Sequence, residues 1–429
     1  MFSVRGTGKT AGQETGRPAA DPAVADPAAG GPESGTPGSG GPGGPRRRRN
    51  QFIALGVTSV AVIALAVAYV VLHAGATRHG RGSGGQGGAS TVAALSVLSV
   101  TPAPGARHAD GSVPVMVQFN APLAAGSPMP VIRPAVPGTW SMVGSDATFT
   151  ATRALRPATR YTVTVPAGQG GVRTGSGALL DRPAVAHFTT RGYSPLRLGQ
   201  LLSQLGYLPL TWSPAQGAAA RAEYQMAGYQ PQSQQALAFS PPAGTFTWQP
   251  GYPSVLASMW QPDRANVVLR GAVMAFQSEH GMTMNGSAGP ALWAALFKAA
   301  RKDQRNVNGY TYALASKALP ESLTIWHNGR IVLRSLANTG IPVAPTADGT
   351  FPVYQRFRFQ IMRGTNPDGS SYADPVSFVS YFNGGDAVHY FPRGGYGYQQ
   401  SLGCVELPYG AAEQAYPYLT YGSLVTVSG

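Results

Sequence analysis

The chain contains 429 residues, of which 43% are hydrophobic and 12% are charged, and its formal net charge is +14. This length predicts several domains, and the high counts of glycine (56) and proline (37) indicate that part of the chain is linker or tail. The arginines beyond the N-terminal region are scattered rather than gathered in a basic stripe with aromatic residues, which argues against nucleic-acid binding. A single cysteine, Cys404, excludes an intramolecular disulfide framework and any metal site made of several cysteines.

The N-terminal residues predict a membrane anchor. Residues 1–51 contain too few large apolar side chains to fold, so we expect a disordered cytoplasmic tail that ends in four arginines at positions 46–49. Residues 52–72 form an uncharged run of 21 residues, which as a helix spans a bilayer core of about 30 Å. The arginines predict a cytoplasmic N-terminus, and a Gly/Ser-rich linker at residues 73–95 leads to domains outside the cell membrane, in the envelope. The alternative is secretion after cleavage of a signal peptide near Ala74-Gly75-Ala76.

Residues 96–191 predict an antiparallel β-sandwich. Short alternating runs at 113–119, 147–151, 161–167 and 185–190 are separated by Pro/Gly turns, without helical periodicity. The order of SVTPAPGA, VQFNAPL, GTW, LRPATRYTVTVPAG and HFTT resembles bacterial Ig-like domains of cell-surface proteins. That resemblance implies a spacing or presenting module rather than a catalytic one.

Residues 192–304 predict a small helical domain. Leucines at 196, 198, 201, 202 and 205 share one face of a helix that ends at Gly206, and two further helices carry Val273, Met274, Phe276 and Leu292, Trp293, Leu296. A loop-rich insertion is expected between the first helix and the second. The pattern of AVMAFQ, HGM and NGSAGPALWAAL resembles the helical peptidoglycan-binding domain. The plain alternative is a three-helix core without affinity for glycan.

Residues 305–429 return to a mostly β pattern. TYALASKA and ESLTIWHNGRIVLRSLANTG predict strands, and Asn328-Gly329 predicts a two-residue hairpin turn. Further strand runs occur at 350–358, 376–382 and 423–427, with a short helix at 410–417.

Residues 386–408 are the candidate catalytic segment, DAVHYFPRGGYGYQQSLGCVELP. It contains Cys404 and, fifteen positions earlier, His389. A thiol is mostly protonated at neutral pH, and a nearby imidazole can accept its proton and leave a nucleophilic thiolate. The glycine-rich loop between them can fold back to bring the two side chains together. Chemistry alone leaves two interpretations of Cys404 open: a small buried hydrophobe or a reactive nucleophile.

The segment from about 306 to 427 resembles the catalytic domain of L,D-transpeptidases, a mostly β family with a cysteine nucleophile. The matching parts follow the order of the family: NTG at 338–340, PTADGTF at 345–351, His389, SLGC at 401–404 and YGSLVTV at 421–427. Two positions depart from the motif. Leu402 stands where the family has a histidine, and Glu406 stands where it commonly has arginine or asparagine.

The resemblance implies roles for individual residues. Cys404 forms a thioester with the donor peptide, and His389 generates the thiolate and later activates the acceptor amine. Ser401 keeps the hydroxyl position of the motif, and the amides of Gly403 and Cys404 are candidate oxyanion donors. Candidate substrate contacts are Arg393, which could receive a stem-peptide carboxylate, and Tyr398; for Arg393 the alternative is a solvated loop residue.

The sequence thus predicts a multidomain, mainly β protein with one N-terminal transmembrane helix, an Ig-like sandwich, a helical peptidoglycan-binding-like domain and a catalytic β domain. By resemblance it cross-links peptidoglycan stem peptides, with no metal or organic cofactor. The expected partners are those peptides and the cytoplasmic membrane, without nucleic acid, and no oligomeric state is predicted. Two alternatives stay open: an L,D-carboxypeptidase that uses the same site with water, and a non-catalytic wall-binding protein whose SLGC motif has lost activity.

Overall fold

The computed structural model describes residues 94–215 and 231–429. The predicted tail, the transmembrane helix at 52–72 and the linker up to residue 93 lie outside the described residues. None of the helices in the described ranges is long and apolar enough to cross a membrane.

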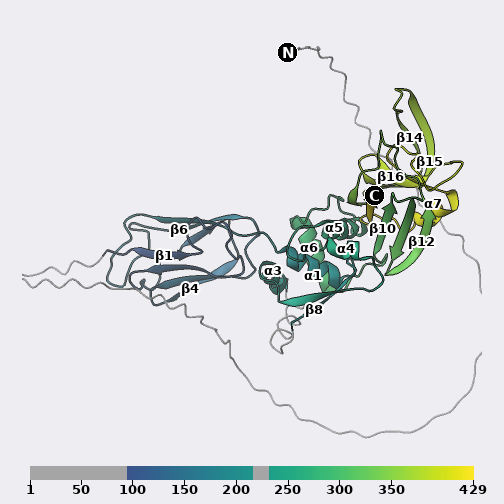
Figure 1. The fold of residues 1–429 in the computed structure, drawn as a ribbon. Helices are drawn as coiled ribbons and strands as arrows, with labels where there is room; N and C mark the ends of the chain where they lie inside the picture. The colour runs from purple at the N-terminus through teal and green to yellow at the C-terminus, as the bar shows by residue number, and fades with distance from the viewer. Residues whose placement is uncertain (1–93, 216–230) are drawn as a thin grey trace, which may run out of the picture. The chain divides into compact units, whose positions relative to one another are not determined.

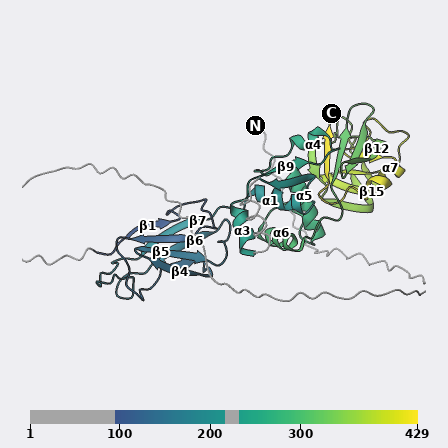
Figure 2. The ribbon, with the colours of Figure 1, turned by 90° about the horizontal axis from the view of Figure 1, so that it is seen from below.

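Strands β1–β7 form the expected β-sandwich (Figures 1 and 2). One sheet has the order β1-β2-β5-β4 and the other β3-β6-β7. Alternate residues such as Val115, Val117 and Phe119 are buried in the core, as expected for sheets that each have one face in solvent. The bounds are β1 Val97–Thr101, β2 Val115–Phe119, β3 Val131–Arg133, β4 Gly138–Val143, β5 Asp146–Ala151, β6 Arg160–Val165 and β7 Ala184–Thr189.

The helical domain contains the three predicted helices, α1 Pro195–Gln204, α5 Val267–Glu279 and α6 Pro290–Lys302. The segment between α1 and α5, expected to be rich in loops, also contains four short elements that were not predicted: β8 Leu210–Pro214, α3 Pro231–Phe239, β9 Gly244–Trp248 and α4 Ser254–Ser258. β8 and β9 pair as an antiparallel ribbon that sets Trp212 opposite Phe246. The two strands are short and far apart in the sequence, so no local hairpin signal announces them.

Two sheets enclose the core of the C-terminal β domain, residues 305–429. One has the order β12-β11-β10-β18-β13, with β10 and β18 parallel; the other has the order β14-β15-β16-β17, with β16 and β17 parallel. The predicted Asn328-Gly329 turn joins β11 to β12. The bounds are β10 Thr311–Ser316, β11 Ser322–His327, β12 Arg330–Leu336, β13 Gly349–Pro352, β14 Gln355–Thr365, β15 Ser371–Asn383, β16 Asp386–Tyr390, β17 Val405–Leu407, α7 Tyr409–Ala415 and β18 Leu424–Ser428.

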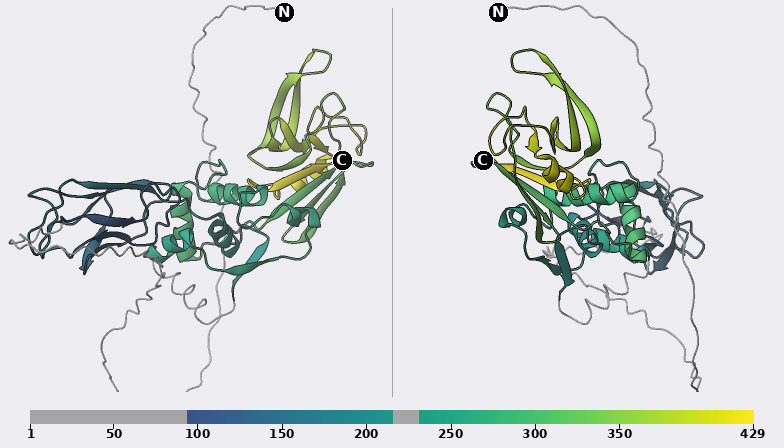
Figure 3. Two further views of the ribbon diagram at one scale, coloured as in Figure 1. Left: turned by 60° about the vertical axis from the view of Figure 1, so that its left-hand side comes forward. Right: turned by 90° about the vertical axis from the view of Figure 1, so that its right-hand side faces the viewer.

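The long hairpin of β14 and β15 extends away from the five-stranded sheet (Figures 1 and 3). Its turn carries Asn366, Pro367, Asp368 and Gly369. Asn, Pro, Asp and Gly are typical turn residues, and alternating strands flank them. The hairpin therefore has a face that does not pack against the five-stranded sheet.

The helical domain and the five-stranded sheet share one hydrophobic core. In β10, Ala313 and Ala315 point into the core of the C-terminal β domain, whereas Tyr312 and Leu314 pack among the leucines of α1, α5 and α6. Leu424 of β18 joins the same helical cluster. Because successive side chains of a strand face opposite sides, the five-stranded sheet is covered by apolar groups on both faces. The boundary near residue 304 is thus a change of secondary structure within one packed unit.

We predict that Gly422→Ala destabilises this shared core by about 1–3 kcal/mol. Gly422 has φ of +82°, and an added Cβ would lie 2.3 Å from the carbonyl oxygen of Gly271 in α5. Gly410→Ala is the matched control, since Gly410 lies in α7 with nothing within 4 Å of an added Cβ. Thermal unfolding of both variants checks this prediction. Equal midpoints would show that the close approach of α5 to the turn before β18 is not needed.

Candidate active site

The parallel pairing of β16 and β17 sets the positions of the candidate catalytic side chains. Val388 pairs with Val405, and both side chains belong to the core of the C-terminal β domain. The next ladder pair is His389 with Glu406. Because side chains alternate along a strand, the side chains of His389 and Glu406 face away from that core. Cys404 lies two residues before Glu406 and faces the same way. The structure thus brings together two residues that are separated by a long glycine-rich loop.

His389 is held as a neutral imidazole with one nitrogen available. Its side chain is 3% exposed, and its Nδ1 lies 3.0 Å from the carbonyl oxygen of Tyr390. A carbonyl only accepts, so Nδ1 carries the proton and Nε2 keeps its lone pair. Burial lowers the pKa of His389. The arrangement suits a general base that starts the reaction unprotonated.

Cys404 is a half-buried free thiol. Burial, with a smaller contribution from the nearby carboxylates of Asp386 and Glu406, raises the pKa of Cys404 to about 12. The thiol Sγ lies 3.7 Å from the carbonyl oxygen of Gly385, to which it donates. A thiol with a raised pKa needs a nearby proton acceptor before it can act as a nucleophile, and the available Nε2 of His389 lines the same cavity as Cys404.

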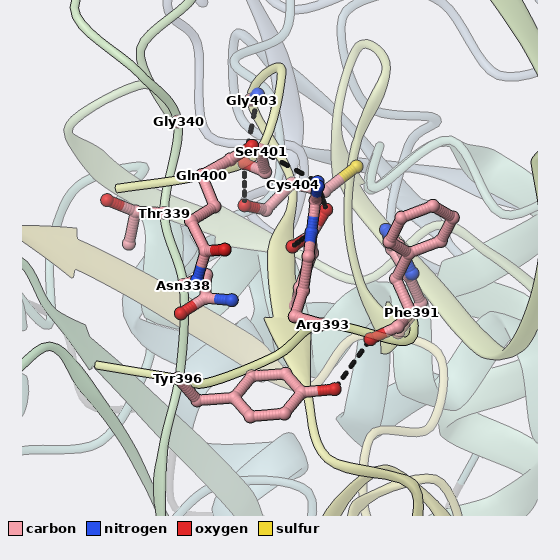
Figure 4. Close-up of polar contacts among 12 residues, drawn as sticks. Asn338, Thr339, Gly340, Phe391, Arg393, Tyr396, Gln400, Ser401, Gly403 and Cys404 are labelled. Carbon is pink, nitrogen blue, oxygen red and sulfur yellow. Dashed lines mark hydrogen bonds and ion pairs between the residues drawn. The ribbon is translucent and has the colours of Figure 1, made fainter. Parts of the chain in front are cut away.

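Ser401 and Gly403 shape the turn that presents the thiol (Figure 4). The buried Ser401 hydroxyl donates to the Cys404 carbonyl at 2.6 Å and accepts from the Gly403 amide at 3.2 Å. Thr346 Oγ1 donates to the same carbonyl at 3.4 Å. Because the Gly403 amide already has a partner here, its predicted oxyanion role stays a prediction that requires this bond to open.

The two predicted substrate contacts lie in different surroundings. Arg393 lines the cavity, but its guanidinium is occupied by Glu406, with Nε to Oε2 at 2.8 Å and Nη2 to Oε1 at 2.7 Å. Arg393 is therefore a paired residue rather than a solvated loop residue, and its contact with a stem carboxylate stays a prediction. Tyr398 is 48% exposed, does not line the cavity, and its amide lies 3.5 Å from Asn338 Oδ1.

A cavity of about 680 Å³ opens in front of Cys404 and His389. Leu402, which stands at the motif histidine position, lines it. The β14–β15 hairpin supplies much of the remaining wall, with Arg363, Tyr372, Asp374 and Tyr381. Sequence reasoning missed these residues, although the Asn366-Pro367-Asp368-Gly369 turn between alternating runs was a usable hairpin signal. Among the described residues, no three His, Cys, Asp or Glu side chains gather in a way that could hold a metal ion.

Comparison with known families identifies two domains. Residues 311–427 match the L,D-transpeptidase catalytic domain, and residues 91–190 match a bacterial Ig-like domain. The chain thus contains an L,D-transpeptidase catalytic domain, C-terminal to an Ig-like domain in the sequence. The peptidoglycan-binding resemblance of residues 192–304 stays a prediction. A search of curated proteins finds no match.

Solved structures similar to the chain include three L,D-transpeptidases. L,D-transpeptidase 3 from Mycobacterium tuberculosis is 14% identical, with 78% of this chain and 98% of that chain covered and a TM-score of 0.26. An L,D-transpeptidase from Mycobacterium smegmatis is 14% identical, with 78% and 99% covered and a TM-score of 0.26. The catalytic domain of the E. faecium L,D-transpeptidase is 24% identical, with 28% and 96% covered and a TM-score of 0.26. The family match and the geometry of the site, rather than these likenesses, support the functional assignment.

We predict that Gly403→Ala disrupts the nucleophile turn. Gly403 has φ of +119°, and an added Cβ would lie 2.6 Å from Asp386 Oδ1. Strain of this kind costs about 1–3 kcal/mol, and relieving it moves Cys404 away from His389. Gly394→Ala is the control within the same loop, because nothing lies within 4 Å of its added Cβ. The measurement is acylation of Cys404 by a β-lactam; equal rates for the two variants would contradict the role given to this turn.

Proposed function

We propose, from the premise that residues 311–427 form an L,D-transpeptidase catalytic domain, that the chain cross-links peptidoglycan stem peptides through Cys404 and His389. The strongest support is that Cys404, the only cysteine, and the buried His389 lie on the same face of the paired strands β16 and β17. His389 donates from Nδ1 to the Tyr390 carbonyl, which leaves Nε2 available. Both side chains line a cavity of about 680 Å³, which is large enough for part of a peptide.

The first half-reaction acylates the thiol. His389 Nε2 accepts the Cys404 proton as Sγ attacks the carbonyl carbon of the donor peptide bond, which gives a tetrahedral intermediate. The C–N bond then breaks, and the imidazolium returns its proton to the departing amine of the terminal residue. The product is a thioester between the donor stem and Cys404.

The second half-reaction transfers the acyl group. The acceptor amine attacks the thioester carbonyl, and His389 accepts its proton as the new C–N bond forms. The C–S bond then breaks, and the thiolate recovers a proton from the imidazolium. If water attacks instead, the same site acts as an L,D-carboxypeptidase, so the acceptor alone separates the two activities.

A membrane anchor places the catalytic domain near its substrate in this proposal. Support comes from the sequence, in which the uncharged run at residues 52–72 follows four arginines at positions 46–49. An arginine block before an apolar helix favours a cytoplasmic N-terminus. The Ig-like, helical and catalytic domains would then lie in the cell envelope, where peptidoglycan stems are found.

We predict that a carbapenem forms one covalent adduct with the protein and that Cys404→Ala abolishes it. Sγ attacks the lactam carbonyl and the ring C–N bond opens, so the whole carbapenem mass stays on the protein. His389→Asn should slow the adduct by about 10²–10⁴-fold, the usual contribution of a general base. Intact-mass spectrometry of the full chain measures both.

His327→Asn is the matched control, because His327 contacts Thr311 and Tyr418 and does not line the cavity. It should acylate at the wild-type rate. No adduct on a folded wild-type protein would favour the non-catalytic wall-binding alternative. An adduct that persists in Cys404→Ala would refute the nucleophile.

A further inference from the structure

Arg393 and Glu406 form an ion pair, and both line the same cavity as Cys404 and His389. Figure 4 shows Arg393 next to Cys404. Arg393 grips the Glu406 carboxylate with two hydrogen bonds, and its Nη2 also donates to the Gln400 carbonyl at 3.1 Å. The Glu406 side chain is 5% exposed and that of Arg393 is 28% exposed. The guanidinium carbon lies 4.7 Å from the centre of the Phe391 ring. The bidentate, half-buried geometry makes this a strong pair rather than a surface contact.

The position of Glu406 makes its charge consequential. It is the ladder partner of His389, and it faces the same side as Cys404, two residues before it. An uncompensated carboxylate at this place would oppose a thiolate on Cys404 and would hold a proton on His389. The first effect works against ionisation of the thiol, and the second works against the later release of the proton from His389.

The other groups that face the dyad do not supply the missing positive charge. Asp386 of β16 and Asp374 of β15 are acidic, and Tyr372 and Tyr381 of β15 are neutral phenols whose pKa values burial raises. Arg363 of β14 lines the cavity but is exposed. Among the described residues that line this cavity, Arg393 is therefore the cation in contact with Glu406.

We propose that Arg393 is a positioning residue that neutralises Glu406 and so permits Cys404 to ionise against His389. The same bonds fasten the loop between β16 and β17 across the nucleophile turn, since Gln400 immediately precedes Ser401. This inference rests on the proposed function for its purpose. Its physical content, control of thiol ionisation, can be measured without any peptidoglycan substrate.

The test is the pH dependence of iodoacetamide alkylation of the full chain, followed by intact mass, since Cys404 is the only cysteine. Loss of the cation in Arg393→Gln should raise the thiol pKa by about one unit, which slows alkylation at pH 8 about tenfold. Glu406→Gln should act in the opposite direction and speed alkylation, because it removes a negative charge. The double variant should return to within about threefold of the wild type.

A purely structural clamp gives a different pattern. In that case Arg393→Gln and Glu406→Gln both disturb the loop and both slow alkylation, and that result would overturn the proposal. Arg363→Gln is the control for the loss of a different cation from the cavity. Its alkylation rate at each pH should differ from that of the wild type by less than about threefold. Arg393→Lys keeps the positive charge without the bidentate hydrogen bonds, so its alkylation rate should follow the wild-type pH profile. A tenfold slower alkylation of Arg393→Lys would also overturn the proposal. This second variant keeps the test open if Arg393→Gln fails to fold.

These outcomes are separate from the fate of the proposed function. If the alkylation rates of the variants follow the predicted order but a carbapenem never acylates the wild type, the ion pair controls the pKa of the Cys404 thiol. In that case only the transpeptidase proposal fails. If acylation occurs but the order is not seen, the role of Arg393 fails alone.

Discussion

The parallel pairing of β16 with β17 is the constraint on which the candidate site depends. Its register sets His389 beside Glu406 and leaves Cys404 on the same face, while Val388 and Val405 fix the opposite face in the core. A slip of one residue would turn the thiol into the core and remove it from the cavity. The nucleophile turn, the loop that carries Arg393 and the orientation of the base all follow from this one ladder.

Support for that ladder comes from packing further away. The five-stranded sheet presents Ala313 and Ala315 to the catalytic core and Tyr312 to the helical domain. The sheet is therefore packed on both faces, and the helical domain buries apolar side chains of the catalytic domain whether or not it binds glycan.

Local signals in the sequence were enough to predict much of the fold. Alternating runs gave the strands of the sandwich, leucine spacing gave α1, and Asn328-Gly329 gave the turn between β11 and β12. The β8–β9 ribbon was missed because its partners are distant in the sequence, and pairing of that kind leaves no local pattern. For the same reason the sequence suggested Cys404 and His389 but not the β14–β15 wall or the bond between Arg393 and Glu406, which depend on how distant segments meet.

The most direct test of the central claim is to incubate the full chain with a disaccharide-tetrapeptide and to analyse the products by mass spectrometry. Cysteine-dependent L,D-transpeptidation predicts a dimer whose mass equals two substrates minus one terminal residue released as the free amino acid. The dimer should be absent with Cys404→Ala. Release of the terminal residue without any dimer would show a carboxypeptidase, and an unchanged substrate with folded protein would contradict catalysis by this site.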